Sequence, residues 1–210
     1  IGRLGAEPLG AASLGLVVFF SVVLAGMGPA MAISPLVSQA IGAGAEAGDD
    51  VRLSVRMGLW GTVLLFPLGL IVCALTEPIA LALGQPPVLA AGAAPYVLAL
   101  APGLPFMLGV MILRNFLAAL GRTRMPLVFI VVTTIFNALL NYLLIFGAFG
   151  FPRLELVGAG IASSLSHALG FVLLVGYARR EPAAAALRPF EAIGVPAWAR
   201  LREVIALGAP

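Results

Sequence analysis

Long apolar intervals dominate the pattern of the chain, and ionisable side chains leave them uninterrupted apart from His167. A helix that crosses a bilayer needs about 20 mostly apolar residues. Two intervals are longer than one crossing requires and contain glycine and proline, so we expect each to include a connecting segment. The pattern therefore predicts about five membrane-spanning helices, which cover residues 10–41, 51–76, 92–120, 126–147 and 156–178.

The composition agrees with a chain whose solvent is lipid. Of its 210 residues, 61% are hydrophobic and 10% are charged, whereas a soluble domain has about 45–50% apolar and about 25% charged residues. A soluble domain is therefore excluded. The predicted fold class is all-α, a polytopic transmembrane helical bundle with membrane lipid as a partner.

Arginine supplies all twelve basic residues, and it is concentrated in alternate connections. The connections after the first, third and fifth spans carry Arg52, Arg56, Arg122, Arg124, Arg179, Arg180, Arg188, Arg200 and Arg202. The opposite side carries only Arg3 and Arg153. Because cytoplasmic loops hold the excess of basic residues, we expect the chain to start outside and the connections at 45–56, 121–125 and 179–203 to be cytoplasmic. This placement, rather than a nucleic-acid partner, accounts for the positive net charge.

Residues 181–203 form a predicted cytoplasmic linker. They mix alanine with arginine, Phe190 and Trp198, a pattern that suits either a helix in the membrane interface or an ordinary linker. An apolar run resumes at residues 204–210, where we expect the next transmembrane helix to start. Since Ile1 is not a start residue, we expect the chain to be a fragment of a longer protein.

Polar side chains inside the predicted spans are the first candidates for function, because the bilayer penalises unpaired polar groups. Thr133, Asn137 and Asn141 are four residues apart, which places them on one stripe of the fourth predicted helix. Their oxygens could bind a small cation, or their side chains could hydrogen-bond to a neighbouring helix. Spacing alone favours the second, structural interpretation.

The fifth predicted helix carries Ser163, Ser164, Ser166 and His167. This polar face could meet the asparagine stripe. His167 is either a neutral, hydrogen-bonded side chain or a group that handles protons. One helix rarely supplies a nucleophile and a base together with an oxyanion hole, so the serines and the histidine do not indicate a hydrolase.

Two further residues bear on the chemistry. Arg114 is the one formal charge inside a span, and it either extends toward the cytoplasmic interface or pairs with an acid outside the chain. Cys73 is alone, which excludes a disulfide framework and a thiolate metal site and favours a role in core packing. The sequence contains no Walker glycine loop and no HExxH motif. We therefore expect neither an enzyme nor a bound cofactor.

Several stretches of the chain resemble the multidrug and toxic compound extrusion (MATE) family, in its NorM-like branch. They agree with the family in order, spacing and sidedness over nearly the whole chain. The stretches are residues 2–6 (GRLGA), 34–44 (SPLVSQAIGAG) with 56–60 (RMGLW), 77–85 (EPIALALGQ), 94–116, and 137–141 (NALLN) followed by 157–162 (VGAGIA).

The resemblance implies a transporter of twelve helices in two lobes around a central cavity. Residues 1–180 would be a partial N-terminal lobe, containing helices two to six, and would need the remaining helices to transport. The complete protein would be a monomeric antiporter of the bacterial inner membrane. It would export cationic amphipathic compounds by alternating access, in exchange for H⁺ or Na⁺.

The resemblance also implies a cation site in this lobe. In the family that site uses an aspartate on helix one, polar residues on helix five and a hydroxyl on helix six. Asn137, Asn141 and Ser163 match the last two helices, whereas the helix with the aspartate lies outside the chain. Some relatives carry aspartate at the position of Asn141, so the choice between H⁺ and Na⁺ stays open. Asn115 becomes a candidate for lining the cavity.

Two rival functions remain. A related lipid-linked oligosaccharide flippase would carry more cationic residues in its cavity to meet pyrophosphate, and here only Arg114 is available. A membrane-embedded enzyme or assembly subunit would be indicated by a nucleophile, metal ligands or paired acids on facing helices. The sequence shows none of these.

Overall fold

The computed structural model describes residues 4–43, 47–191, 194, 197–198 and 201. The helices are α1 (Ala6–Ala43), α2 (Ala47–Ala74), α3 (Thr76–Ala82), α4 (Pro87–Leu100), α5 (Leu104–Ala119), α6 (Arg124–Phe146), α7 (Glu155–Arg180) and α8 (Pro182–Ala186), with short 3₁₀ turns η2 (Ala101–Gly103) and η3 (Ala148–Gly150). Five candidate spans in this part of the chain are long and apolar enough to cross a membrane, one of them made of α4, η2 and α5. The predicted all-α bundle of about five spans is confirmed.

The first two helices begin earlier than the hydrophobic pattern predicts. α1 starts at Ala6 and includes Pro8 in its first turn, where proline is tolerated because its missing N–H has no helical partner there. α2 starts at Ala47, so Asp49 and Asp50 form part of its first turn. Carboxylates are favourable at a helix N-terminus because they oppose its positive dipole end. The polar residues Asp49 and Asp50 before the predicted span are therefore already helical.

The third predicted span is interrupted in its middle. α4 ends at Leu100, and the 3₁₀ turn that contains Pro102 separates it from α5. Proline lacks the N–H that would continue the helical bonding, so carbonyls of the preceding turn need other donors. The single O–H of Ser164 on α7 is shared between the carbonyls of Ala99 (2.7 Å) and Leu100 (3.1 Å). A serine on one helix therefore compensates for the break in another.

Replacing Ser164 with alanine is expected to lower the free energy of unfolding by about 1 kcal/mol, because the carbonyls of Ala99 and Leu100 lose the hydroxyl that they share. Ser13→Ala is the control, since that hydroxyl is exposed and donates within its own helix, to Leu9. Denaturant unfolding of the complete protein in micelles measures both changes. Equal stability of the two variants would contradict the role assigned to Ser164.

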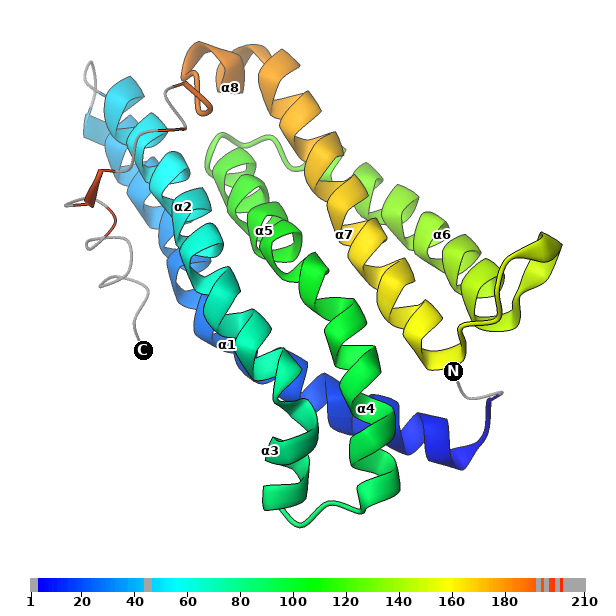
Figure 1. Ribbon diagram of the computed structural model, residues 1–210. Helices are drawn as coiled ribbons and strands as arrows, with labels where there is room; N and C mark the ends of the chain where they lie inside the picture. The colour runs from blue at the N-terminus through cyan, green and yellow to red at the C-terminus, as the bar shows by residue number, and fades with distance from the viewer. Residues whose placement is uncertain (1–3, 44–46, 192–193, 195–196, 199–200, 202–210) are drawn as a thin grey trace.

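The long helices form a bundle in which α5 is central (Figure 1). α1 packs on α2, α4 and α5, while α7 packs on α4, α5 and α6. α6 packs chiefly on α7, and only 11% of its span is buried, against 39% or more for the other spans. Figure 1 also shows that α1 bends along its length. The face of α6 toward α7 is therefore the part of α6 where this chain can build a site.

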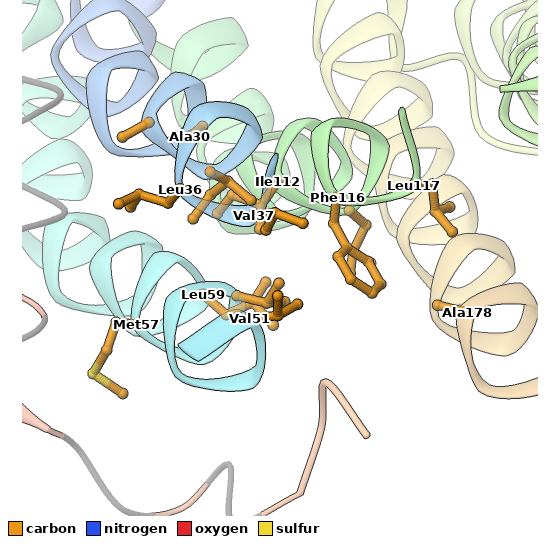
Figure 2. Close-up of a cluster of buried hydrophobic side chains, with 14 of the residues drawn as sticks. Ala30, Leu36, Val37, Val51, Met57, Leu59, Ile112, Phe116, Leu117 and Ala178 are labelled. Carbon is orange, nitrogen blue, oxygen red and sulfur yellow. The ribbon is translucent and has the colours of Figure 1, made fainter. Parts of the chain in front are cut away.

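Two apolar clusters form the core. The larger joins the ends of α1, α2, α5 and α7 that are predicted to be cytoplasmic, and Figure 2 shows its side chains, with Phe116 projecting from α5. The second cluster lies toward the other end and contains Cys73 and Tyr96, both buried. Cys73 is thus a packing residue, as expected. Both clusters hold α5 and α7 in place beside α6.

The segment after α7 folds onto the predicted cytoplasmic end of the bundle. Glu181 accepts from Tyr177 (2.9 Å) and pairs with Arg122 (2.9 Å), and Glu191 pairs with Arg52 at the start of α2. The one helix that the structure describes here is α8, which is five residues long. Residues 200 and 202, and the predicted start of a further helix at 204–210, lie outside the described residues.

Candidate functional site

The site is built where α6 turns back into α7. Gly147 ends α6 at a φ of 69°, a left-handed conformation that glycine adopts without strain. The N–H of Leu154 then donates to the carbonyl of Leu144 (2.8 Å), which ties the start of α7 to the end of α6. Gly158 lies against the same carbonyl, and a Cβ at Gly158 would be only 2.6 Å from its oxygen. The absence of a side chain lets the two helices approach closely.

The two carboxamides of α6 are joined on the face toward α7. The Nδ2 of Asn141 donates to the Oδ1 of Asn137 at 2.8 Å, and both side chains are half-buried. This bond orients both groups and leaves the Oδ1 of Asn141 available to another partner. The carboxamide pocket, of about 370 Å³, is lined by Tyr96, Ala138, Asn141, Tyr142, Ile145, Phe146, Ala159 and Ser163.

A second cavity lies beside the first and shares Ser163 with it. The histidine chamber, of about 260 Å³, is lined by Thr133, Thr134, Asn137, Ser163, Ser166 and His167. All six lining residues are polar. The hydroxyls of Thr133 and Ser166 donate to carbonyls of their own helices, to Phe129 (2.9 Å) and Ala162 (2.7 Å). Their oxygens therefore remain acceptors toward the chamber.

The structure brings most of the predicted site residues together. Thr133, Asn137, Asn141, Ser163 and His167 all line one or both cavities between α6 and α7. They meet because the stripe on α6 faces the polar face of α7. The cation-binding role of Asn137, Asn141 and Ser163 stays a prediction, as does the cavity or coupling role of Thr133 and His167.

Two predicted residues lie elsewhere. The Nδ2 of Asn115 donates to the carbonyl of Ala30 at 2.8 Å and so links α5 to α1. Arg114 is exposed on α5. Neither residue lines the cavities between α6 and α7. Asn115 has the geometry of a helix-to-helix contact, since its donor is already engaged by a backbone acceptor.

The hydrophobic pattern did not single out the aromatic wall of the carboxamide pocket. Tyr96 comes from α4, and Tyr142 follows Asn141 directly on α6. The sequence feature that could have indicated Tyr96 and Tyr142 is their place inside apolar spans, where the hydroxyl is the one polar group of a large side chain. Placing Tyr96 beside Asn141 requires the packing of α4 on α7, which no local pattern encodes.

The arrangement can bind a small hard cation through neutral oxygens. Amide and hydroxyl oxygens suit such ions better than nitrogen or sulfur ligands do. No carboxylate is among the described residues that line either cavity. The described residues also contain no cluster of three His, Cys, Asp or Glu side chains suited to a transition metal.

The sequence model of the MatE family matches residues 1–143, which include both asparagines of α6. The chain belongs to the MatE family. Members of this family are transporters and not enzymes, in agreement with the expectation from the sequence. The expected relationship to MATE proteins is therefore confirmed, and the chain is a multi-pass membrane protein.

MatE relatives extend the match through α7. The chain is 41% identical, over its whole length, to a probable multidrug resistance protein NorM of Rhizobium meliloti, covering 44% of that protein. It is 39% identical to the NorM protein of Bradyrhizobium diazoefficiens, again over its whole length and 45% of the relative. The chain thus spans less than half the length of these curated relatives.

Solved structures of the same family confirm the fold. The crystal structure of the eukaryotic MATE transporter AtDTX14 superimposes with a TM-score of 0.81 at 24% identity, over 99% of this chain and 46% of that one. An inward-facing MATE transporter superimposes with a TM-score of 0.79 at 20% identity, over 98% of this chain and 45% of that one. The MatE chain therefore has the helical arrangement of about half of a MATE transporter.

Proposed function

We propose that the chain is part of the N-terminal lobe of a cation-coupled multidrug antiporter in the bacterial cytoplasmic membrane. It acts with helices outside the chain to export cationic, amphipathic compounds in exchange for H⁺ or Na⁺. The similarity to bacterial proteins named as probable multidrug resistance proteins supports the export of several compounds by a bacterial protein. The complete protein works as a monomer.

The observation that carries this proposal is the carboxamide pocket between α6 and α7. Asn141 is oriented by its bond to Asn137, and Ser163 lines the same pocket from α7. Oriented oxygens at the depth of the bilayer are costly unless they bind something. A small cation that is completed by an acid from a further helix satisfies them.

The packing of α6 supports the coupling of this pocket to transport. α6 packs chiefly on α7, so a change at their shared face can shift α6 with few other contacts to break. A cation that binds only one arrangement of the two helices biases the lobe toward that arrangement. Alternating access follows if the two arrangements open the central cavity to opposite sides.

The proposal is tested with the complete protein in proteoliposomes loaded with ethidium. Efflux is measured under a sodium gradient alone, under a proton gradient alone and with both gradients collapsed. We expect one of the two single gradients to drive efflux and the collapsed state to stop it. Efflux that continues at the same rate without either gradient would exclude an antiporter.

A further inference from the structure

The histidine chamber lies between the carboxamide pocket and the predicted cytoplasmic end of the bundle. On α7, His167 follows Ser163 by one turn in the direction of the basic C-terminal end. On α6, Thr133 precedes Asn137 by one turn, toward the basic N-terminal end. Both helices therefore place the chamber on the same side of the pocket.

The two cavities share one lining residue, Ser163. Its half-buried hydroxyl makes no hydrogen bond to the part of the chain that the structure describes. Asn137 lines the chamber and is bonded to Asn141, which lines the pocket. A cation that moves from the Oδ1 of Asn141 toward the chamber therefore approaches the hydroxyls and the carboxamide that line the chamber.

The size and lining of the chamber make it a site for water. A water molecule occupies about 30 Å³ and is held where it finds two to four polar partners. The chamber measures about 260 Å³ and has a lining of hydroxyls, a carboxamide and an imidazole. It can therefore hold several waters, whereas the apolar pocket between α1, α2 and α5 has two polar side chains, Ser21 and Thr62, among its twelve described lining residues.

The charged groups near α7 leave this route open to a cation. Of the helices that pack on α7, α5 carries Arg114 and α6 carries Arg124, and neither lines the chamber. The titratable phenols near α7, Tyr96 on α4 and Tyr142 on α6, line the carboxamide pocket and not the histidine chamber. No fixed positive charge among the described lining residues repels a cation on its way through.

We propose that the histidine chamber is the hydrated passage through which the coupling cation leaves the carboxamide pocket for the cytoplasmic side. The passage rests on the proposed function, because it serves the cation site assigned there. Thr133 and His167 supply hydrogen-bonding atoms to the water in the passage. They are not ligands of the bound cation. Their replacement by apolar side chains of similar volume therefore slows ion movement without weakening the site, because a cation that crosses an apolar constriction loses its hydration.

The test compares His167→Phe and Thr133→Val with the wild type in the complete protein. Exchange of radioactive sodium from the cytoplasmic side of oriented proteoliposomes gives the rate, and release of protons to a trapped pH dye gives the same rate for a proton-coupled protein. Equilibrium binding of the same ion gives the affinity. We expect exchange to slow about tenfold in each variant while the affinity stays within about twofold.

Three variants serve as controls. His167→Gln keeps a polar side chain and should recover most of the exchange that His167→Phe loses. Thr62→Val makes the same chemical change as Thr133→Val at a buried threonine outside the chamber, and it should leave exchange unchanged. Asn141→Ala, in contrast, should weaken binding itself.

The outcomes separate the passage from the proposed function. Unchanged exchange in His167→Phe and Thr133→Val would overturn the passage and leave the antiporter standing. A loss of affinity in step with the loss of rate would show that these residues are ligands and would also overturn it. If the wild type exchanges neither ion, both proposals are contradicted.

Discussion

Asn141→Ala is expected to reduce cation-driven efflux by the complete protein at least tenfold. The substitution removes the Oδ1 that faces the carboxamide pocket and the Nδ2 that holds Asn137 in place at 2.8 Å. Losing the partner that orients a ligand typically costs a metal site about 10–100-fold in affinity. Here a proposed ligand and an orienting bond are lost together. Efflux of ethidium under the driving gradient measures the effect, with binding of the coupling ion as a second readout.

Cys73→Ala provides the comparison. Cys73 is equally an intramembrane residue, but it is buried in the second core cluster and lines neither cavity between α6 and α7. The substitution removes one sulfur from the core, so we expect a small loss of stability and wild-type coupling. If both variants transport equally well, the carboxamides of α6 are structural contacts between helices.

Gly158→Val is expected to destabilise the fold by about 3 kcal/mol and to separate α6 from α7. A Cβ at Gly158 would lie 2.6 Å from the carbonyl oxygen of Leu144 and 2.7 Å from its carbon. These are backbone atoms, and the carbonyl is also held by the N–H of Leu154. Neither helix can yield locally, so the added side chain must push the helices apart. Thermal unfolding of the purified complete protein measures the loss.

Gly176→Val is the matched control on the same helix. A Cβ at Gly176 meets nothing within 4 Å, so valine there should change stability by less than about 1 kcal/mol. Comparable destabilisation by both variants would show that valine harms α7 through helix propensity and not through contact with α6. Cation binding should fall in Gly158→Val and persist in Gly176→Val, because only Gly158 sets the spacing of the two cavity walls.

The helices were largely predictable because the bilayer imposes a simple length rule. The five predicted spans correspond to the five spans of the structure, since an apolar run of sufficient length has no stable alternative in lipid. The ends were less predictable. The sequence places Asp49 and Asp50 in the connection at 45–56, before the predicted span, yet they lie in the first turn of α2, where the helix dipole favours them.

The candidate site was predictable as a list of residues but not as two cavities. Spacing places Thr133, Asn137 and Asn141 on one stripe, and the structure turns that stripe toward Ser163 and His167. Asn115 shows the limit of such reasoning. The resemblance to the MATE family makes it a candidate for lining the cavity, whereas its side chain bonds α5 to the carbonyl of Ala30 on α1.

The sequence by itself determined that this protein is a multi-pass membrane protein, which side its arginines favour and which polar residues share a helical face. These properties depend on local composition and helical periodicity. Only the tertiary structure decided that Tyr96 joins the carboxamide pocket, that Ser163 links it to the histidine chamber and that Asn115 is a contact between helices. Those outcomes depend on which helices touch, and here that is decided by close approaches such as that of Gly158 to Leu144.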